Sequence, residues 1–257
     1  MDDPTAHLRE ILADDGRPDG ERERLIRLML LFAGKPAPTG LGDFAPDYGA
    51  LRERFVATLD GDDGEAAEEA FLTLYAHVHG HEAPYTAEER RRVDETGGYW
   101  GHAGGLSPVL KAGPWITPDT VLGDFGAGNG LQGLLIQWLH PHRRTIQIEI
   151  SRGMIEIGRR LQAWLGIPED RVEWVCGDVL DATPAGMDFI YIYRPVRPVG
   201  EGLKFYERFG AELARTTNPV VIFSVADCLG PFLPDHFDVI YGDGHLTCYR
   251  RAVATRG

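Results

Sequence analysis

The stretch from residue 121 to residue 130, VLGDFGAGNG, constrains the fold of this chain more than any other feature. Apolar residues lead into three glycines, Gly126, Gly128 and Gly130, and a helical pattern opens at Leu131. Glycine permits a tight turn and a close approach of the backbone to a ligand, and a helix N-terminus offers unpaired N–H groups. Strand, turn and helix in this order predict a binding crevice at the carboxyl end of a strand in an open α/β sheet.

Strand-like and helical stretches alternate through the rest of the C-terminal part, which predicts a mostly parallel sheet with helices on both faces. Only Gly242, Asp243 and Gly244 separate the last two expected strands, a spacing typical of a hairpin, so we expect one edge strand to run antiparallel. The seven expected strands are residues 120–125, 145–150, 172–176, 189–193, 220–225, 237–241 and 245–250, and the clearest helices are residues 131–139, 151–165 and 203–215.

The N-terminal part differs in charge and in period. Residues 1–95 carry 22 acidic and 11 basic residues, a net charge of −11, whereas residues 96–257 carry 17 and 15, a net charge of −2. Amphipathic spacing predicts helices over residues 21–32, 48–59 and 64–78. We therefore expect an N-terminal helical cap over residues 1–95 and a ligand-binding domain over residues 96–257.

Composition excludes several classes of protein. The formal charge of −13 disfavours a nucleic-acid partner, which normally meets a basic face. The most apolar N-terminal run, residues 25–33, contains Arg27 and is too short to span a bilayer, so we expect no membrane partner and a cytoplasmic location. No disulfide framework or metal site is expected, because Cys176, Cys228 and Cys248 form no CxxC pair and the alternating histidines His77, His79 and His81 lack further ligands at a suitable spacing.

The glycine spacing indicates which ligand the crevice takes. A dinucleotide fingerprint GxGxxG would need glycine at position 131, where Leu131 stands, which disfavours an NAD-dependent enzyme. Asp124 precedes the glycines, Glu149 ends the next expected strand, and a Gly-Asp pair containing Asp178 follows the third. A carboxylate at the position of Glu149 accepts hydrogen bonds from ribose hydroxyls.

These residues, in this order and spacing, resemble the class I S-adenosylmethionine-dependent methyltransferases over about residues 120–195. The resemblance implies a Rossmann-like fold of seven strands with a reversed final strand, and S-adenosyl-L-methionine as cofactor. It implies that Asp178 lies beside the adenine amino group, with the Val179 amide nearby. The cofactor-binding residues that it implies are Tyr99, Asp124, Gly126, Ala127, Gly128, Gly130, Glu149, Ile150, Asp178, Val179 and Tyr193.

The fourth expected strand departs from one branch of that family. Nucleic-acid amino methyltransferases usually carry Asn- or Asp-Pro-Pro-aromatic there, whereas this chain has Tyr193, Arg194, Pro195 and Val196, which disfavours methylation of adenine or cytosine. Tyr193, Arg194 and Arg197 are expected to flank the crevice. Either arginine is a candidate to bind a substrate carboxylate bidentately; an ion pair with a nearby acid is the alternative.

A glycine-rich segment over residues 96–108 is the second candidate for the acceptor side. It carries Tyr99, Trp100, His102 and Ser107 just before the first expected strand. His102 has a suitable unperturbed pKa for a general base, so His102 and Tyr193 are the expected catalytic residues. The alternative is a plain connector with a packed tryptophan.

The sequence thus predicts a methyltransferase that acts on a small-molecule acceptor by O- or N-methylation in an in-line transfer. Two alternatives stay open: a protein methyltransferase, because the acidic N-terminal part would attract a basic polypeptide, and a non-catalytic module that binds the cofactor without turnover.

Overall fold

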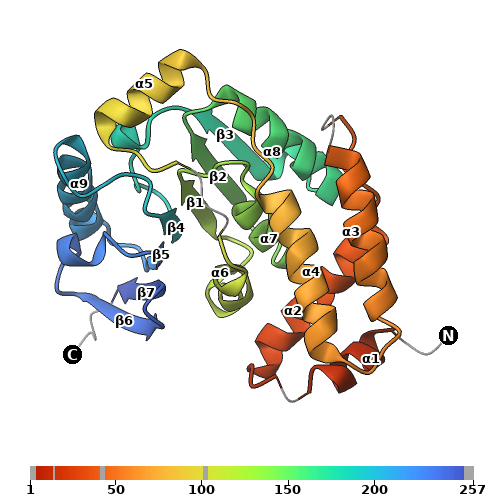
Figure 1. Ribbon diagram of the computed structural model, residues 1–257. Coiled ribbons are helices and arrows are strands. Elements are labelled where there is room, and N and C mark those ends of the chain that lie inside the picture. The colour runs from red at the N-terminus through yellow and green to blue at the C-terminus, as the bar shows by residue number, and fades with distance from the viewer. Residues whose placement is uncertain (1–3, 14, 41–43, 101–103, 252–257) are drawn as a thin grey trace, which may run out of the picture. The chain divides into compact units, whose positions relative to one another are not determined.

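The computed structural model describes residues 4–13, 15–40, 44–100 and 104–251 (Figure 1). They fall into two compact units, Met1–His81 and Glu82–Gly257. The division lies nearer the N-terminus than the boundary after residue 95 that the sequence predicted, so the helix at Ala87–Thr96 belongs to the second unit. None of the described helices is both long enough and apolar enough to cross a membrane.

The described residues of the first unit form four helices, which bury a cluster of aromatic rings. The Phe71 ring lies at its centre, 5.5 Å from the ring of Phe32 and 5.6 Å from that of Phe55, measured between centroids. Asp63 caps the last of the helices by accepting a hydrogen bond from the Ala66 N–H at 3.0 Å. The three predicted helices are confirmed, and a short one precedes them; the bounds are α1 (Pro4–Ile11), α2 (Asp19–Gly34), α3 (Phe44–Thr58) and α4 (Gly64–His79).

The second unit is built on a seven-stranded sheet with the order β3-β2-β1-β4-β5-β7-β6. The first five strands in this order are parallel to one another, and β7 is antiparallel to both of its neighbours. The bounds are β1 (Val121–Phe125), β2 (Arg144–Glu149), β3 (Val172–Cys176), β4 (Phe189–Tyr193), β5 (Val221–Val225), β6 (Phe237–Gly242) and β7 (Leu246–Arg251).

This arrangement confirms the predicted Rossmann-like sheet and its reversed final strand. The expectation that the reversed strand lies at the edge is wrong: β7 inserts between β5 and β6, and β6 forms the edge. The hairpin signal at Gly242–Gly244 fixed the pairing of the last two strands, but it carried no information about which of them would also pair with β5.

Helices cover both faces of the sheet (Figure 1). Side chains alternate along β1: Phe125 packs with Phe209 of α9 (Glu201–Arg215), whereas Asp124 points to the other face, beside Gly133 of α7 (Leu131–Leu139). Beside α7 lies α8 (Arg152–Leu165). The remaining elements are α5 (Ala87–Thr96), α6 (Ser107–Lys111) and four short 3-10 helices at Gly113–Trp115, Glu169–Arg171, Val179–Asp181 and Gly230–Phe232.

Candidate functional site

The glycine-rich turn joins β1 to α7 at the carboxyl edge of the sheet. Gly126, Gly128 and Gly130 all have positive φ angles, of 79°, 59° and 71°. Gly130 is further constrained because a Cβ there would overlap the Trp174 ring. The turn is held down by the Gly126 and Ala127 N–H groups, which donate to the Ile148 carbonyl at 3.0 and 2.9 Å. The loop therefore passes directly over the end of β2. The strand, glycine turn and helix follow one another as the sequence predicted.

Glu149 ends β2 and is bound to that turn. Its Oε2 accepts the Gly128 N–H at 2.8 Å and its Oε1 accepts the Ser151 N–H at 2.9 Å. The residue is only 4% exposed, and this burial raises the pKa of its carboxyl to about 7 in spite of the hydrogen bonds. Tyr85 and Glu89 lie near enough for their charges to interact with it. Glu149 is therefore a buried carboxylate with both oxygens engaged by backbone N–H groups.

Asp124 lies beneath the turn rather than at its surface. Burial, followed by the charge of Glu149, raises the pKa of its carboxyl to about 8. Among the described residues its Oδ2 has no hydrogen-bond partner, and a Cβ on Gly133 would sit 3.1 Å from it. Asp124 is therefore a buried residue that packs against the start of α7.

Asp178 follows β3 and caps the short helix Val179–Asp181. Its Oδ1 accepts the Leu180 N–H at 2.9 Å, and its Oδ2 accepts the Arg92 Nε at 2.7 Å. Val179 is buried, and Ile150 follows Glu149 at the end of β2. The structure therefore brings Glu149 and Asp178 to the ends of adjacent parallel strands, on the same edge as the glycine turn.

The acceptor candidates gather at the end of β4. The guanidinium carbons of Arg194 and Arg197 lie 4.2 and 4.9 Å from the centroid of the Tyr99 ring. The Tyr99 N–H donates to the Pro195 carbonyl at 3.0 Å, which attaches residues 97–99 to this strand end. The Tyr193 ring meets that of His245 edge-on at 5.9 Å. His102, the expected general base, lies outside the described residues.

The backbone and side-chain environment of Arg194 bears on the role of the two arginines. Arg194 has a φ angle of 33°, which is strained for a residue with a side chain. Its Nε is buried without a hydrogen-bond partner among the described residues. Neither arginine forms an ion pair with a described carboxylate; both lie over the same tyrosine ring instead. The alternative that each pairs with a nearby acid is therefore not what the described residues show.

Residues of α5 and its flanks also lie at the carboxyl edge of the sheet, and the sequence did not predict this helix. Glu89 accepts the Arg152 N–H at 3.1 Å at the start of α8, and Arg92 reaches Asp178. The Tyr85 and Trp100 rings meet edge-on at 5.2 Å, and Tyr85 is half-buried, which raises its pKa. The signal for this helix was available: Thr86 and Glu89 form a capping box, a pattern readable from the sequence.

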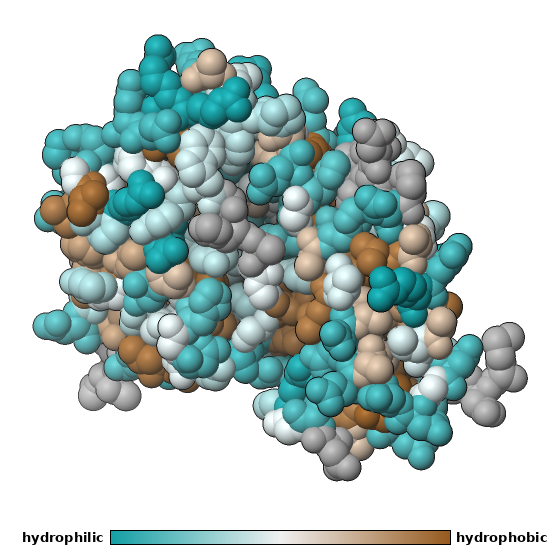
Figure 2. Space-filling view, in the orientation of Figure 1, coloured by the Kyte–Doolittle hydropathy of each residue, from teal (hydrophilic) through white to brown (hydrophobic). Residues whose placement is uncertain are grey.

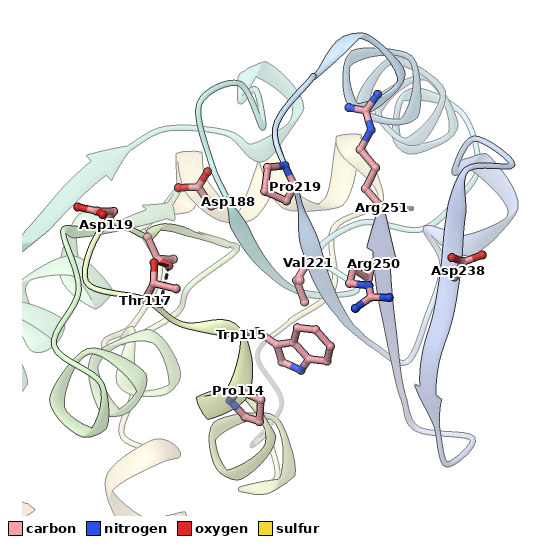
Figure 3. A pocket seen from close by; sticks show the side chains of 11 residues that line it. Pro114, Trp115, Thr117, Asp119, Asp188, Pro219, Val221, Asp238, Arg250 and Arg251 are labelled. Carbon is pink, nitrogen blue, oxygen red and sulfur yellow. Dashed lines mark hydrogen bonds between the residues drawn. The ribbon is translucent and has the colours of Figure 1, made fainter. Parts of the chain in front are cut away.

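A cavity of about 670 Å³ lies at the opposite edge of the sheet (Figure 3). Thr120, Asp188 and Val221, at the amino ends of β1, β4 and β5, line it together with Trp115 and Arg250. Asp188 is already engaged, because its Oδ2 accepts the Val121 N–H at 3.0 Å. This cavity is separate from the carboxyl edge where the glycine turn and its acids converge. In the described part of the chain no group of three or more His, Cys, Asp or Glu side chains is placed to hold a metal ion.

No protein-family model and no curated protein matches this chain. Similar solved structures include an RNA methyltransferase from Salinibacter ruber in complex with S-adenosyl-L-homocysteine, with 20% identity, 60% of this chain and 95% of that chain covered, and a TM-score of 0.45. A methyltransferase from Geobacter sulfurreducens is 18% identical, with 70% of this chain and 97% of that chain covered and a TM-score of 0.44. TrmN from Thermus thermophilus is 18% identical, with 57% of this chain and 48% of that chain covered and a TM-score of 0.43. Similarities of this size do not identify a cofactor or an acceptor for this chain.

Proposed function

We propose that this chain is an S-adenosyl-L-methionine-dependent methyltransferase. The observation that carries the proposal is the convergence, at one edge of the sheet, of the positive-φ glycine turn, the buried Glu149 bound to it, and Asp178 one strand further out. A glycine turn leaves room for a ligand against the backbone, and two carboxylates at neighbouring strand ends suit the hydroxyl and amino groups of an adenosine. Ala127, Ile150 and Val179 would complete this cradle.

The cofactor supplies an electrophilic methyl group on a sulfonium, so the protein mainly has to position the acceptor and take up a proton. We place the acceptor beside Tyr99 and Tyr193, with Arg194 and Arg197 holding its anionic group. Two guanidinium groups on one aromatic ring, with no carboxylate partner among the described residues, support an acceptor that carries a carboxylate. His102 is the proposed general base, on the strength of its titration range alone.

The proposed acceptor is a small molecule rather than a nucleic acid. The net charge of −13 and the Tyr193–Val196 sequence, which lacks an amide or carboxylate for an exocyclic amine, both support this. A protein acceptor is the second candidate, since residues 1–95 carry a net charge of −11 and would attract a basic polypeptide.

The test combines calorimetry with a product assay on the wild-type protein. We expect S-adenosylmethionine to bind, and S-adenosylhomocysteine to be released with a pool of small carboxylic acids. Release only with basic peptides would favour the second candidate. Binding without release in any pool would make the chain a non-catalytic module, and no binding at about millimolar ligand, some 4 kcal/mol of affinity, would overturn the proposal.

A further inference from the structure

Helix α5 lies across the carboxyl edge of the sheet and is held there mainly by polar contacts. Of its ten residues only Val93 and Thr96 are buried, and its outer surface is hydrophilic (Figure 2). It is attached after three of the strands. Glu89 contacts the residues after β2, and Arg92 contacts Asp178 after β3. The chain just after the helix contacts Val196 and Arg197 after β4. Figure 1 shows the helix, in yellow, above these strand ends.

The contact between Arg92 and Asp178 contributes little to stability. The Arg92 side chain is 46% exposed, and that of Asp178 is 12% exposed. Ion pairs with one partner this open to solvent add little to folding stability, because solvent screens the attraction and both side chains lose freedom. The same helix carries a longer and more exposed pair, Arg91 with Glu95 at 3.8 Å, in which both partners belong to α5 itself.

What the contact does fix is the orientation of one carboxylate. The Leu180 N–H donates to Oδ1 of Asp178, and the Arg92 Nε donates to Oδ2. A carboxylate with a separate donor on each oxygen cannot rotate without breaking one of the two bonds. Each oxygen keeps a further lone pair, so the plane of the group is set before any ligand arrives.

We propose that Arg92 is a positioning residue for base selectivity: it fixes the Asp178 carboxylate so that it accepts an exocyclic amino group and rejects an oxo group at the same place. This inference rests on the proposed function, in which Asp178 meets the adenine. A fixed carboxylate oxygen and an oxo group on the base are both hydrogen-bond acceptors, so they repel each other when they are aligned. A carboxylate that is free to rotate relieves this repulsion. Selectivity for adenine over hypoxanthine therefore depends on Arg92, although Arg92 need not touch the base.

The test compares S-adenosylhomocysteine with S-inosylhomocysteine, in which an oxo group replaces the adenine amino group, by calorimetry on the full chain. We expect the wild type to prefer the adenine ligand by about tenfold or more, the scale of one hydrogen bond to a charged group. Arg92→Met should reduce this preference to about twofold to threefold, and Arg92→Lys should restore part of it. The matched control Arg91→Met, on the same helix, should leave the preference at the wild-type value.

The outcomes separate this proposal from the proposed function. An unchanged preference in Arg92→Met, or an equal weakening of both ligands, would overturn the positioning role and leave Arg92 as a structural contact of α5. A wild type that binds neither ligand would overturn the proposed function and this proposal with it. Thermal unfolding of each variant shows whether the chain is still folded during the comparison.

Discussion

The two halves of the carboxyl edge are built in different ways. The proposed cofactor half, at the ends of β1, β2 and β3, is held by backbone amides. Glu149 and Asp178 each accept N–H groups from residues close by in the chain or from the neighbouring turn. The acceptor half, at the ends of β4 and β5, has a strained residue after each strand, Arg194 with φ 33° and Ala226 with φ 48°. Strain of this kind costs about 1–3 kcal/mol per residue and is concentrated at functional sites.

This difference separates what a fold supplies from what a particular chain adds. The proposed cofactor half consists of a turn and two strand-end acids whose positions follow from the parallel sheet itself. The acceptor half depends on a segment that arrives from elsewhere: Tyr99, which precedes β1, lies against Arg194 and Arg197, which follow β4. We therefore expect damage in the cofactor half to impair folding and cofactor binding, and damage in the acceptor half to impair only use of the acceptor.

The largest expected effect is on the pH dependence of stability. The carboxyl of Asp124 has a reference pKa of 3.8 and a folded value of about 8, raised by burial and then by Glu149. The folded state therefore favours the protonated carboxyl. The stability that this protonated carboxyl contributes is fully present below about pH 4 and is lost as the pH rises to about 8. The side chain in Asp124→Asn stays neutral at every pH. Between about pH 5 and about pH 9 the free energy of unfolding of this variant should therefore fall by about 2–5 kcal/mol less than that of the wild type.

Urea unfolding at the two pH values measures this difference. Asp119→Asn, at an exposed position just before β1, is the control and should follow the wild type. Parallel pH curves for wild type and Asp124→Asn would show that the acid beneath the turn is not held neutral by its burial.

Gly130→Ala tests whether the turn is as rigid as its contacts suggest. The substitution forces a side chain into a φ angle of 71° and against the Trp174 ring. Strain and overpacking together should cost about 2–4 kcal/mol and abolish cofactor binding. Gly166→Ala is the matched control, because Gly166 has a φ angle of 74° but nothing within 4 Å of the new Cβ. Equal losses in the two variants, measured by chemical unfolding, would contradict a special role for the packing at Gly130.

Glu149→Ala should weaken cofactor binding by about 1.5–3 kcal/mol, the value of hydrogen bonds to a charged group. The physical reason is twofold, since the change removes the acceptor for the ribose and releases the Gly128 N–H that Glu149 holds at 2.8 Å. Glu173→Ala, which removes an exposed acid paired with Arg144 on the neighbouring strand, should leave the affinity unchanged. Calorimetry that finds the same affinity in wild type and Glu149→Ala would remove Glu149 from the cofactor site.

The smallest effect falls on the acceptor half. Arg194→Met should raise KM for a carboxylated acceptor by about tenfold, near 1.4 kcal/mol, while cofactor affinity stays at the wild-type value. Arg250→Met removes an arginine that also lies over an aromatic ring, Trp115 at 5.7 Å, but at the amino edge, and it should change neither quantity. A loss of cofactor affinity in Arg194→Met would mean that the two halves are not separable.

The sequence could predict where the glycine turn and the two acids lie in the sheet because their positions follow from local patterns. Glu149 is the last residue of β2 and Asp178 follows β3 by two residues, so both could be placed from the ends of strands with a recognisable apolar pattern. The seven strands and the parallel majority followed from the same patterns. The place of β7 between β5 and β6 could not, because a hairpin signal does not say which of its strands pairs with the rest of the sheet.

The arrangement of the proposed acceptor half was harder to predict, because it depends on contacts between residues far apart in the sequence. Tyr99, Arg194 and Arg197 were all named as candidates, but their contact depends on a backbone bridge between Gly98 and Val196 that no local pattern indicates. Helix α5 was overlooked because it is short, strongly charged and has only two buried residues, so it has no amphipathic stripe to detect. Its capping box and the glycine at its C-terminus, Gly97, were the local signals.

The most direct test of the account is a crystal structure with S-adenosylhomocysteine. The account predicts ribose hydroxyls within hydrogen-bond reach of Glu149, the adenine amino group on Asp178, and the thioether sulfur facing Tyr193. A ligand bound instead in the cavity lined by Trp115 and Arg250, or an empty carboxyl edge at a saturating concentration, would contradict it.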